Sequence, residues 1–193
     1  MSRRSGSRRC SPASAAVLSL FAFFFTADLK FKEDGSGKVA LVYPAAKVTT
    51  VDVEQRRFES TTTHATGLRI ENGAARVRVA FSDVTRLAQA PEFQNTTVEL
   101  TPGPDGTETF RATLRAALVG NVLSDRMATV RVTLPGEVVD SNALSTSGST
   151  AMWWAPITSY FSGEGIEISA TYRRSKAPSQ EMAERVSEST TRE

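Results

Sequence analysis

Cysteine and histidine are nearly absent from this sequence, which contains one of each. A single cysteine, Cys10, cannot form a disulfide within the chain, and a single histidine, His64, excludes a metal site built from several histidines. Long blocks of proline, glycine or like charge are also missing, which excludes a collagen-like chain and a wholly disordered one. We therefore expect one globular domain with short tails, stabilised by an apolar core.

The densest apolar run lies near the N-terminus, from Ala15 to Phe25, and follows a segment with four arginines and no acidic residue. A positive segment before an apolar run of about 7–15 residues is typical of a secretory signal peptide. A membrane-spanning helix needs about 20 apolar residues, so this run is short for a span. We predict that residues 1–27 are a signal peptide or an N-terminal membrane anchor. Both remain open, because Phe25 stands where a cleavage site prefers a small residue.

Residues 1–27, which we call the leader, carry positive charge and no negative charge. The whole chain has 23 Lys and Arg against 21 Asp and Glu, a net charge of +2. Residues 1–27 hold four of the cations and none of the acids, so the remaining chain has 19 cations against 21 acids, or −2. A slightly acidic domain does not favour nucleic acid as a partner, and we expect no nucleic-acid binding.

After residue 27 the sequence alternates apolar and polar residues, which is the pattern of half-buried β-strands. Asp34-Gly35 and Asn72-Gly73 separate pairs of alternating segments, and both dipeptides favour hairpin turns. Further alternating segments lie at residues 98–100, 110–116, 128–134 and 166–172, with a short aromatic segment at 152–154. We expect eight to ten short strands.

Helical signals are few. Val48, Val51 and Phe58 fall at helical spacing, which predicts a helix between residues 48 and 60. Asp83 is placed to cap a short helix that Pro91 limits.

The pattern as a whole predicts an α+β fold, in which an antiparallel β-sheet built from hairpins packs against one or two helices. We assign this domain to residues 28–174 and expect residues 175–193 to form a polar, mobile tail.

No motif in the sequence predicts catalysis. Gly35-Ser36-Gly37-Lys38 matches part of a phosphate-binding loop, but Val39 stands where a hydroxyl should bind magnesium, and a strand follows instead of a helix. His64 lies in a threonine-rich segment, which we interpret as an exposed loop without a nucleophile motif. We therefore expect no enzymatic activity, no cofactor and no bound metal.

The tryptophan pair, Trp153 and Trp154, is the best candidate for a binding site. Adjacent strand residues point to opposite faces, so one ring fills the core while the other faces solvent, a groove or a bilayer interface. Together with Phe58 and Phe161, this pair forms the predicted ligand-binding set. We expect an apolar cavity lined by Val51, Phe58, Trp153 and Phe161.

Several segments resemble the LppM-like domain of bacterial envelope lipoproteins. Residues 28–37 are similar to its opening hairpin, and residues 132–143 to its strand, Pro-Gly turn and Ser-Asn corner. Residues 147–156 and 166–172 resemble its later strands, so the similarity covers most of the predicted domain. The resemblance implies an exported, membrane-tethered domain of antiparallel sheet with packed helices, suspected in parts of the family to hold lipids. The chain departs from the family pattern because no cysteine follows its apolar run.

We therefore expect a non-enzymatic domain of the cell envelope, either on the extracytoplasmic side of the cytoplasmic membrane or secreted. The expected partners are a membrane, reached through the N-terminal apolar segment, and a lipid or other amphiphile held between sheet and helix. The alternative is an accessory or scaffold protein that binds a membrane-protein partner through its Trp-containing edge.

Overall fold

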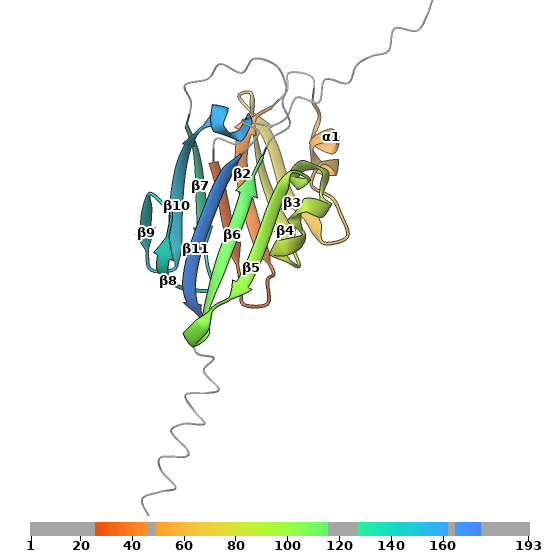
Figure 1. The fold of residues 1–193 in the computed structure, drawn as a ribbon. Coiled ribbons are helices and arrows are strands. Elements are labelled where there is room, and N and C mark those ends of the chain that lie inside the picture. The colour runs from red at the N-terminus through yellow and green to blue at the C-terminus, as the bar shows by residue number, and fades with distance from the viewer. Residues whose placement is uncertain (1–25, 46–48, 116–126, 162–164, 175–193) are drawn as a thin grey trace, which may run out of the picture.

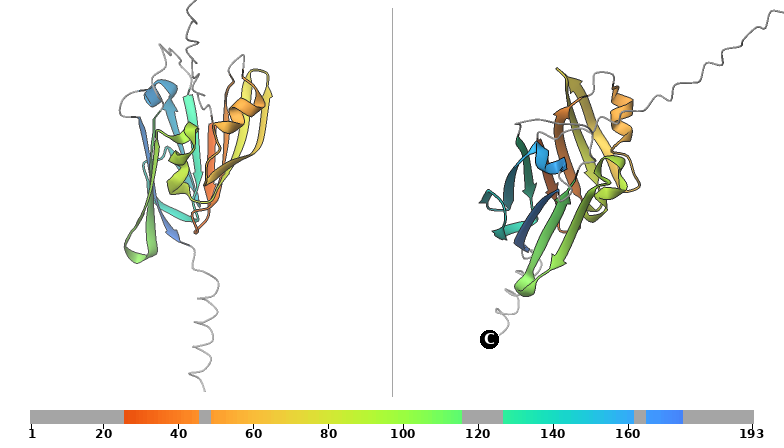
Figure 2. Two further views of the ribbon diagram at one scale, coloured as in Figure 1. Left: turned by 90° about the vertical axis from the view of Figure 1, so that its right-hand side faces the viewer. Right: turned by 45° about the horizontal axis from the view of Figure 1, so that its top comes forward.

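The computed structural model describes residues 26–45, 49–115, 127–161 and 165–174. Within these residues the chain forms two β-sheets that pack face to face (Figures 1 and 2). The predicted leader, apart from its last two residues, and the predicted tail at 175–193 lie outside the described residues. The first strand begins at Thr26, two residues before the expected domain boundary at Asp28.

One sheet has seven strands and the other has four. In spatial order, the seven-stranded sheet consists of β3 (Thr63–Glu71), β4 (Ala74–Phe81), β2 (Gly37–Pro44), β1 (Thr26–Phe31), β7 (Met127–Thr133), β10 (Thr150–Pro156) and β9 (Ser145–Ser147). The four-stranded sheet consists of β5 (Thr96–Pro102), β6 (Thr107–Leu114), β11 (Ile166–Arg174) and β8 (Gly136–Ser141). Strands β1 and β7 run parallel, and the other neighbours are antiparallel.

The helical segments in the part of the chain that the structure describes are all short. It comprises the α-helix α1 (Val51–Arg56) and the 3-10 segments η1 (Val84–Gln89), η2 (Pro91–Phe93), η3 (Pro104–Gly106) and η4 (Ile157–Phe161). Figure 2 shows η1 and η2 between the two sheets, on the side of β3 and β5. None of the described helices is both long and apolar enough to cross a membrane. The fold is predominantly β, and the α+β prediction is wrong.

The α+β prediction failed because the expected helix between residues 48 and 60 contributes little apolar surface to the core. It is present as α1, with six residues, but its first residue Val51 is 44% exposed. Phe58, the apolar residue that packs inward, lies beyond the end of α1. The second sheet was missed for a different reason. Alternation marks a strand with one buried face, but it does not say which sheet the strand joins.

The hairpin turns lie where the turn signals predicted them. Gly35 has a φ of 78° in the turn between β1 and β2. Asn72 and Gly73 have φ values of 51° and 73° between β3 and β4, as a two-residue hairpin turn with both central residues left-handed requires. Strand β2 ends at Pro44, which has no N–H to donate to the strand ladder.

The predicted Pro135-Gly136 turn carries the chain from one sheet to the other. Strand β7 of the seven-stranded sheet ends at Thr133, and β8 of the four-stranded sheet begins at Gly136. A Cβ atom on Gly136 would lie 1.9 Å from the carbonyl oxygen of Arg173 in β11. Only glycine therefore allows β8 to approach β11 this closely.

The buried faces of both sheets form one apolar core. Residues that contribute to it include Leu41, Val77, Val79 and Val132 from the seven-stranded sheet, and Phe110, Ile168 and Tyr172 from the four-stranded sheet. Phe31 connects the layers, because its ring centroid lies 5.7 Å from that of Phe110 and 6.4 Å from that of Tyr172. This burial is the main stabilising contribution that the structure shows.

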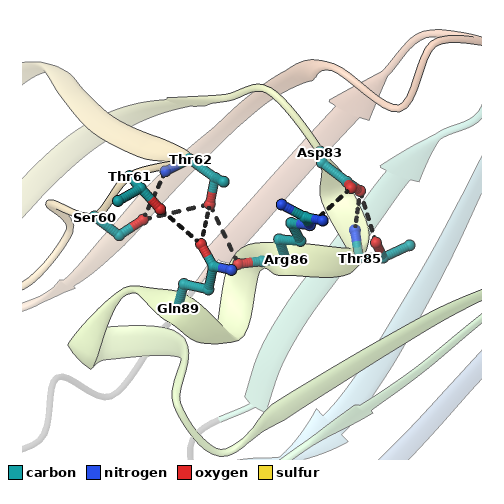
Figure 3. Close-up of polar contacts among 7 residues, drawn as sticks. All are labelled: Ser60, Thr61, Thr62, Asp83, Thr85, Arg86 and Gln89. Carbon is teal, nitrogen blue, oxygen red and sulfur yellow. Dashed lines mark hydrogen bonds and ion pairs between the residues drawn. The ribbon is translucent and has the colours of Figure 1, made fainter.

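Hydrogen bonds connect the threonine-rich segment before β3 to η1, as Figure 3 shows. The hydroxyls of Thr61 and Thr62 donate hydrogen bonds to Oε1 of Gln89, at 3.0 and 3.1 Å. Asp83 caps η1 by accepting a hydrogen bond of 2.9 Å from the backbone N–H of Thr85. The short helix expected after Asp83 is thus present, as a 3-10 segment. The hydroxyls of this segment serve to hold two elements together.

Candidate functional site

The tryptophan pair lies on β10, with one ring on each face of the seven-stranded sheet. Trp153 is 5% exposed and points into the core. Its indole N–H donates a 2.7 Å hydrogen bond to Oδ1 of Asn142, which also accepts one of 2.8 Å from the backbone N–H of Ser169. Trp154 is 56% exposed on the outer face. The two rings thus take opposite faces, as strand alternation predicts, and Trp153 packs in the core.

The predicted ligand-binding set is not brought together as one apolar lining. Phe58 is fully buried, and its ring centroid lies 6.3 Å from that of Tyr43 in β2. Strands β1 and β7 lie between β2, which contains Tyr43, and β10, which contains Trp153. At a strand spacing of about 4.8 Å, Trp153 is therefore about 14 Å from β2 across the sheet. Val51 faces solvent, so the expectation that it lines a cavity is wrong. The side chain of Phe161 lies outside the described residues, although η4 includes its backbone.

A buried polar cluster that the sequence did not predict lies beside Phe58. Glu54 of α1 accepts hydrogen bonds from the hydroxyls of Tyr43 at 2.6 Å and Thr49 at 2.8 Å. Arg57 donates to Glu54 at 2.8 Å and also pairs with Glu92 of η2. One guanidinium therefore lies between two buried carboxylates. The cluster joins α1, β2 and η2, and it replaces the apolar contacts expected of this helix.

The burial of this cluster changes how its members titrate. Burial raises the pKa of Glu92 to about 7, although Arg57 opposes the shift. Burial, with the hydrogen bond to Glu54, also raises the pKa of Tyr43 above its ordinary value. Glu92 thus changes charge near neutral pH, and Tyr43 remains a hydrogen-bond donor.

The exposed face of the seven-stranded sheet carries a second group of residues that sequence analysis missed. The cross-strand registers place Trp154 in one row with Thr129, Thr26, Val42, Arg76 and Arg69, from β10 across to β3. The next two rows contain Arg131, Asp28 and Arg78, and then Lys30, Lys38 and His64. His64 is exposed and lies in β3 opposite Ala80, so its interpretation as a loop residue is wrong.

We call this surface the basic face. It carries six cations and two acids: Lys30, Lys38, Arg69, Arg76, Arg78 and Arg131, with Asp28 and Glu71. All six cations are exposed. The one ion pair that the structure shows for them joins Arg131 to Asp28 at 3.8 Å, so the other five have no ion-pair partner among the described residues. The face therefore has a net charge of +4 from these eight residues.

Two pairs of like charges lie directly opposite each other on the basic face. Lys30 of β1 is opposite Lys38 of β2, and Arg69 of β3 is opposite Arg76 of β4. Like charges at directly opposed strand positions destabilise a sheet. These positions therefore do not serve the stability of the sheet.

The outer face of the four-stranded sheet has the opposite charge. Its outward-facing charged residues are Arg111 and Arg173, against Glu99, Glu137, Asp140 and Glu167. Two cations against four acids give −2 for this face. The molecule is thus electrically polar, with its positive side on the seven-stranded sheet and its negative side on the four-stranded sheet.

Comparison with known proteins shows a distant structural similarity. No protein-family model and no curated protein matches the chain. The folded domain of the Mycobacterium tuberculosis LppM protein, solved by NMR, is similar to it with a TM-score of 0.46 and 15% sequence identity, covering 82% of this chain and 92% of that chain. The similarity is one of overall fold, and membership of the LppM-like family stays a prediction.

Proposed function

We propose that the chain is a non-enzymatic, membrane-associated domain of the cell envelope that works by binding, with its binding surface around Trp154. The exposure of Trp154 is the observation that carries this proposal. Met127, which is 48% exposed, lies on the same face, opposite Pro156 and diagonal to Trp154. Two large apolar side chains side by side on an outer face are typical of a contact surface.

The N-terminal leader supports the membrane part of this proposal. Its arginines and apolar run are the features of an export signal or membrane anchor, and β1 begins directly after the run. The basic face lies on the sheet that contains β1, so the attachment point and the exposed tryptophan belong to one layer.

The proposed ligand is a lipid or other amphiphile bound at this surface. Phe58 and Trp153 pack against protein in the core, which favours the surface over the interior as the place of binding. A membrane-protein partner is the alternative, because an indole ring beside an edge strand suits a protein contact equally well.

The test is the behaviour of the full chain expressed in a bacterial envelope. We expect it in the membrane fraction, and its intact mass decides whether the leader is retained or cleaved. Trp154→Ala should reduce recovery of a copurifying amphiphile, whereas Val139→Ala, which removes an exposed apolar side chain from β8 of the four-stranded sheet, should not.

Three results bear on the alternatives. Loss of a copurifying membrane protein, with lipid recovery unchanged, would favour the scaffold function. A chain found wholly outside the membrane fraction, with Trp154→Ala indistinguishable from the parent, would refute the proposal. Equal loss of binding in the Val139→Ala variant would show that the effect is not specific to this surface.

A further inference from the structure

We propose that the basic face of the seven-stranded sheet docks flat on an anionic lipid bilayer, with Trp154 and Met127 at the headgroup level. This inference rests on the proposed function and names the partner of the surface around Trp154. It adds that the cations of β1, β2, β3, β4 and β7 bind lipid phosphates, so that the whole outer face is the contact surface.

Charge complementarity is the first argument for an anionic partner. The face holds six exposed cations, of which one has an ion pair that the structure shows. Lys30 and Lys38 lie opposite each other, as do Arg69 and Arg76, although such pairing destabilises a sheet. An anionic surface at this face would attract both members of each pair and offset their mutual repulsion. Binding to such a surface therefore accounts for cations at these positions.

The layout of the face favours a bilayer. The rows run from β10 to β3 over five strand spacings, or about 24 Å, and between the cations lie small or short side chains such as Ala40, Thr129 and Thr133. Trp154, at one margin, is the one Phe, Tyr or Trp on the described part of this face, whereas surfaces that bind single-stranded nucleic acid stack successive bases on several aromatic rings. A broad surface with dispersed cations suits the distributed phosphates of a bilayer.

Trp154 supplies the apolar part of the contact. It lies near one margin of the basic face, in the same row as Arg76 and Arg69. Tryptophan and cations at one level are the combination enriched at the membrane interface, where an indole ring has an apolar body and a polar N–H. Indole and guanidinium groups can therefore meet the bilayer together.

The charge on the opposite face of the molecule determines which face turns toward an anionic bilayer. The four-stranded sheet presents two cations and four acids, so an anionic bilayer repels it. Electrostatic torque then turns the basic face toward the membrane before any specific contact forms.

The chain itself provides a selective probe of this docking. It has two tryptophans in total, Trp153 and Trp154, and the leader contains none. Insertion of the leader alone therefore does not place an indole ring in the bilayer. We propose to add phosphatidylglycerol/phosphatidylcholine vesicles to the full chain and to record tryptophan emission, with and without bromine on the upper acyl chains.

We expect a blue shift and bromine quenching with phosphatidylglycerol vesicles, and neither with pure phosphatidylcholine. Trp154→Phe leaves Trp153, which is buried, as the sole reporter, so shift and quenching should both disappear. Raising the salt from about 0.1 to about 1 M shortens the screening length from about 10 to about 3 Å and should weaken the response strongly.

Variants that remove two cations from one face or from the other test which face binds the vesicle. Lys38→Gln with Arg78→Gln removes two cations from the centre of the basic face and should lower vesicle partitioning about 25-fold, or about five-fold per cation. The matched control, Arg111→Gln with Arg173→Gln, removes the same charge from the four-stranded sheet and should not lower partitioning.

Vesicle flotation separates failure of this inference from failure of the proposed function. A chain that floats with vesicles while Trp154 emission stays unchanged would overturn face docking and leave membrane association standing. A chain that does not float with any vesicle would refute both. Equal effects of the two double variants, equal response to neutral vesicles, or the same Trp154 response to duplex DNA would each overturn docking of this face on anionic lipid.

Discussion

Glu92 should make the stability of this protein depend on pH in a window around neutrality. Its side chain is 5% exposed and pairs with Arg57, which already contacts Glu54. Burial is the largest influence on Glu92, and it raises the pKa from 4.5 to about 7. The perturbation that tests this is Glu92→Gln, because glutamine has the shape of a protonated carboxyl group and can still accept a hydrogen bond from Arg57.

The direction of the effect follows from proton binding in the two states. Below pH 4.5 both the folded and the unfolded chain hold the proton, and this group contributes no pH dependence. Between 4.5 and about 7 the unfolded chain has lost the proton while the folded chain retains it, so the free energy of unfolding falls as pH rises. At about 1.4 kcal/mol per pKa unit, the full loss is about 3 kcal/mol, reached above pH 7.

Urea unfolding, followed by tryptophan emission at several values between pH 5 and pH 8, measures this slope. We expect the parent chain to lose stability across the window and Glu92→Gln to lose much less. Glu99→Gln, on the exposed outer face of β5, is the control and should keep the parent slope. If the free energy of unfolding of Glu92→Gln has the same slope against pH as that of the parent, Glu92 does not hold a proton in the folded state, and the reasoning is refuted.

Two further substitutions test the core. Phe58→Ala should lower the free energy of unfolding by about 3–5 kcal/mol, as truncation of a buried phenylalanine does, while the exposed Val51→Ala should change it by less than about 0.5 kcal/mol. Urea titrations measure both, and a small loss at Phe58 would contradict its place in the core. Asn142→Ala leaves the N–H groups of Trp153 and Ser169 without their acceptor, at a cost of about 1–3 kcal/mol and with altered near-ultraviolet dichroism. An unchanged spectrum with parent stability would show that water replaces Asn142.

Local structure was predictable here because its causes are local. A positive φ at Asn72 and Gly73 is available to few residue types, so the dipeptide fixes a turn wherever alternating segments flank it. The end of β2 at Pro44 follows equally directly from the missing N–H. These features depend on neighbours in sequence, and the hairpins that they define are present.

The arrangement of the hairpins depends on distant residues and was not predictable. The parallel pairing of Ala27 with Val130 holds the seven-stranded sheet together at its middle, yet nothing in either segment specifies the other. Glu54 was missed for a related reason. A glutamate in a helical pattern is normally assigned to the solvent side, and its burial is tolerable only because Tyr43, Thr49 and Arg57 satisfy both of its oxygens.

The candidate site shows the same division between local and distant causes. Strand alternation shows that Trp153 and Trp154 take opposite faces, but it does not show which face is covered. Net charge was the wrong quantity for choosing a partner, because −2 for residues 28–193 averages two faces of opposite sign. Each pair of like charges lies within one hairpin, and strand order then brings Lys30 and Lys38 onto one surface with Arg69 and Arg76. The field that a membrane meets is that of a single face, so a nearly neutral domain can still bind an anionic bilayer in one orientation.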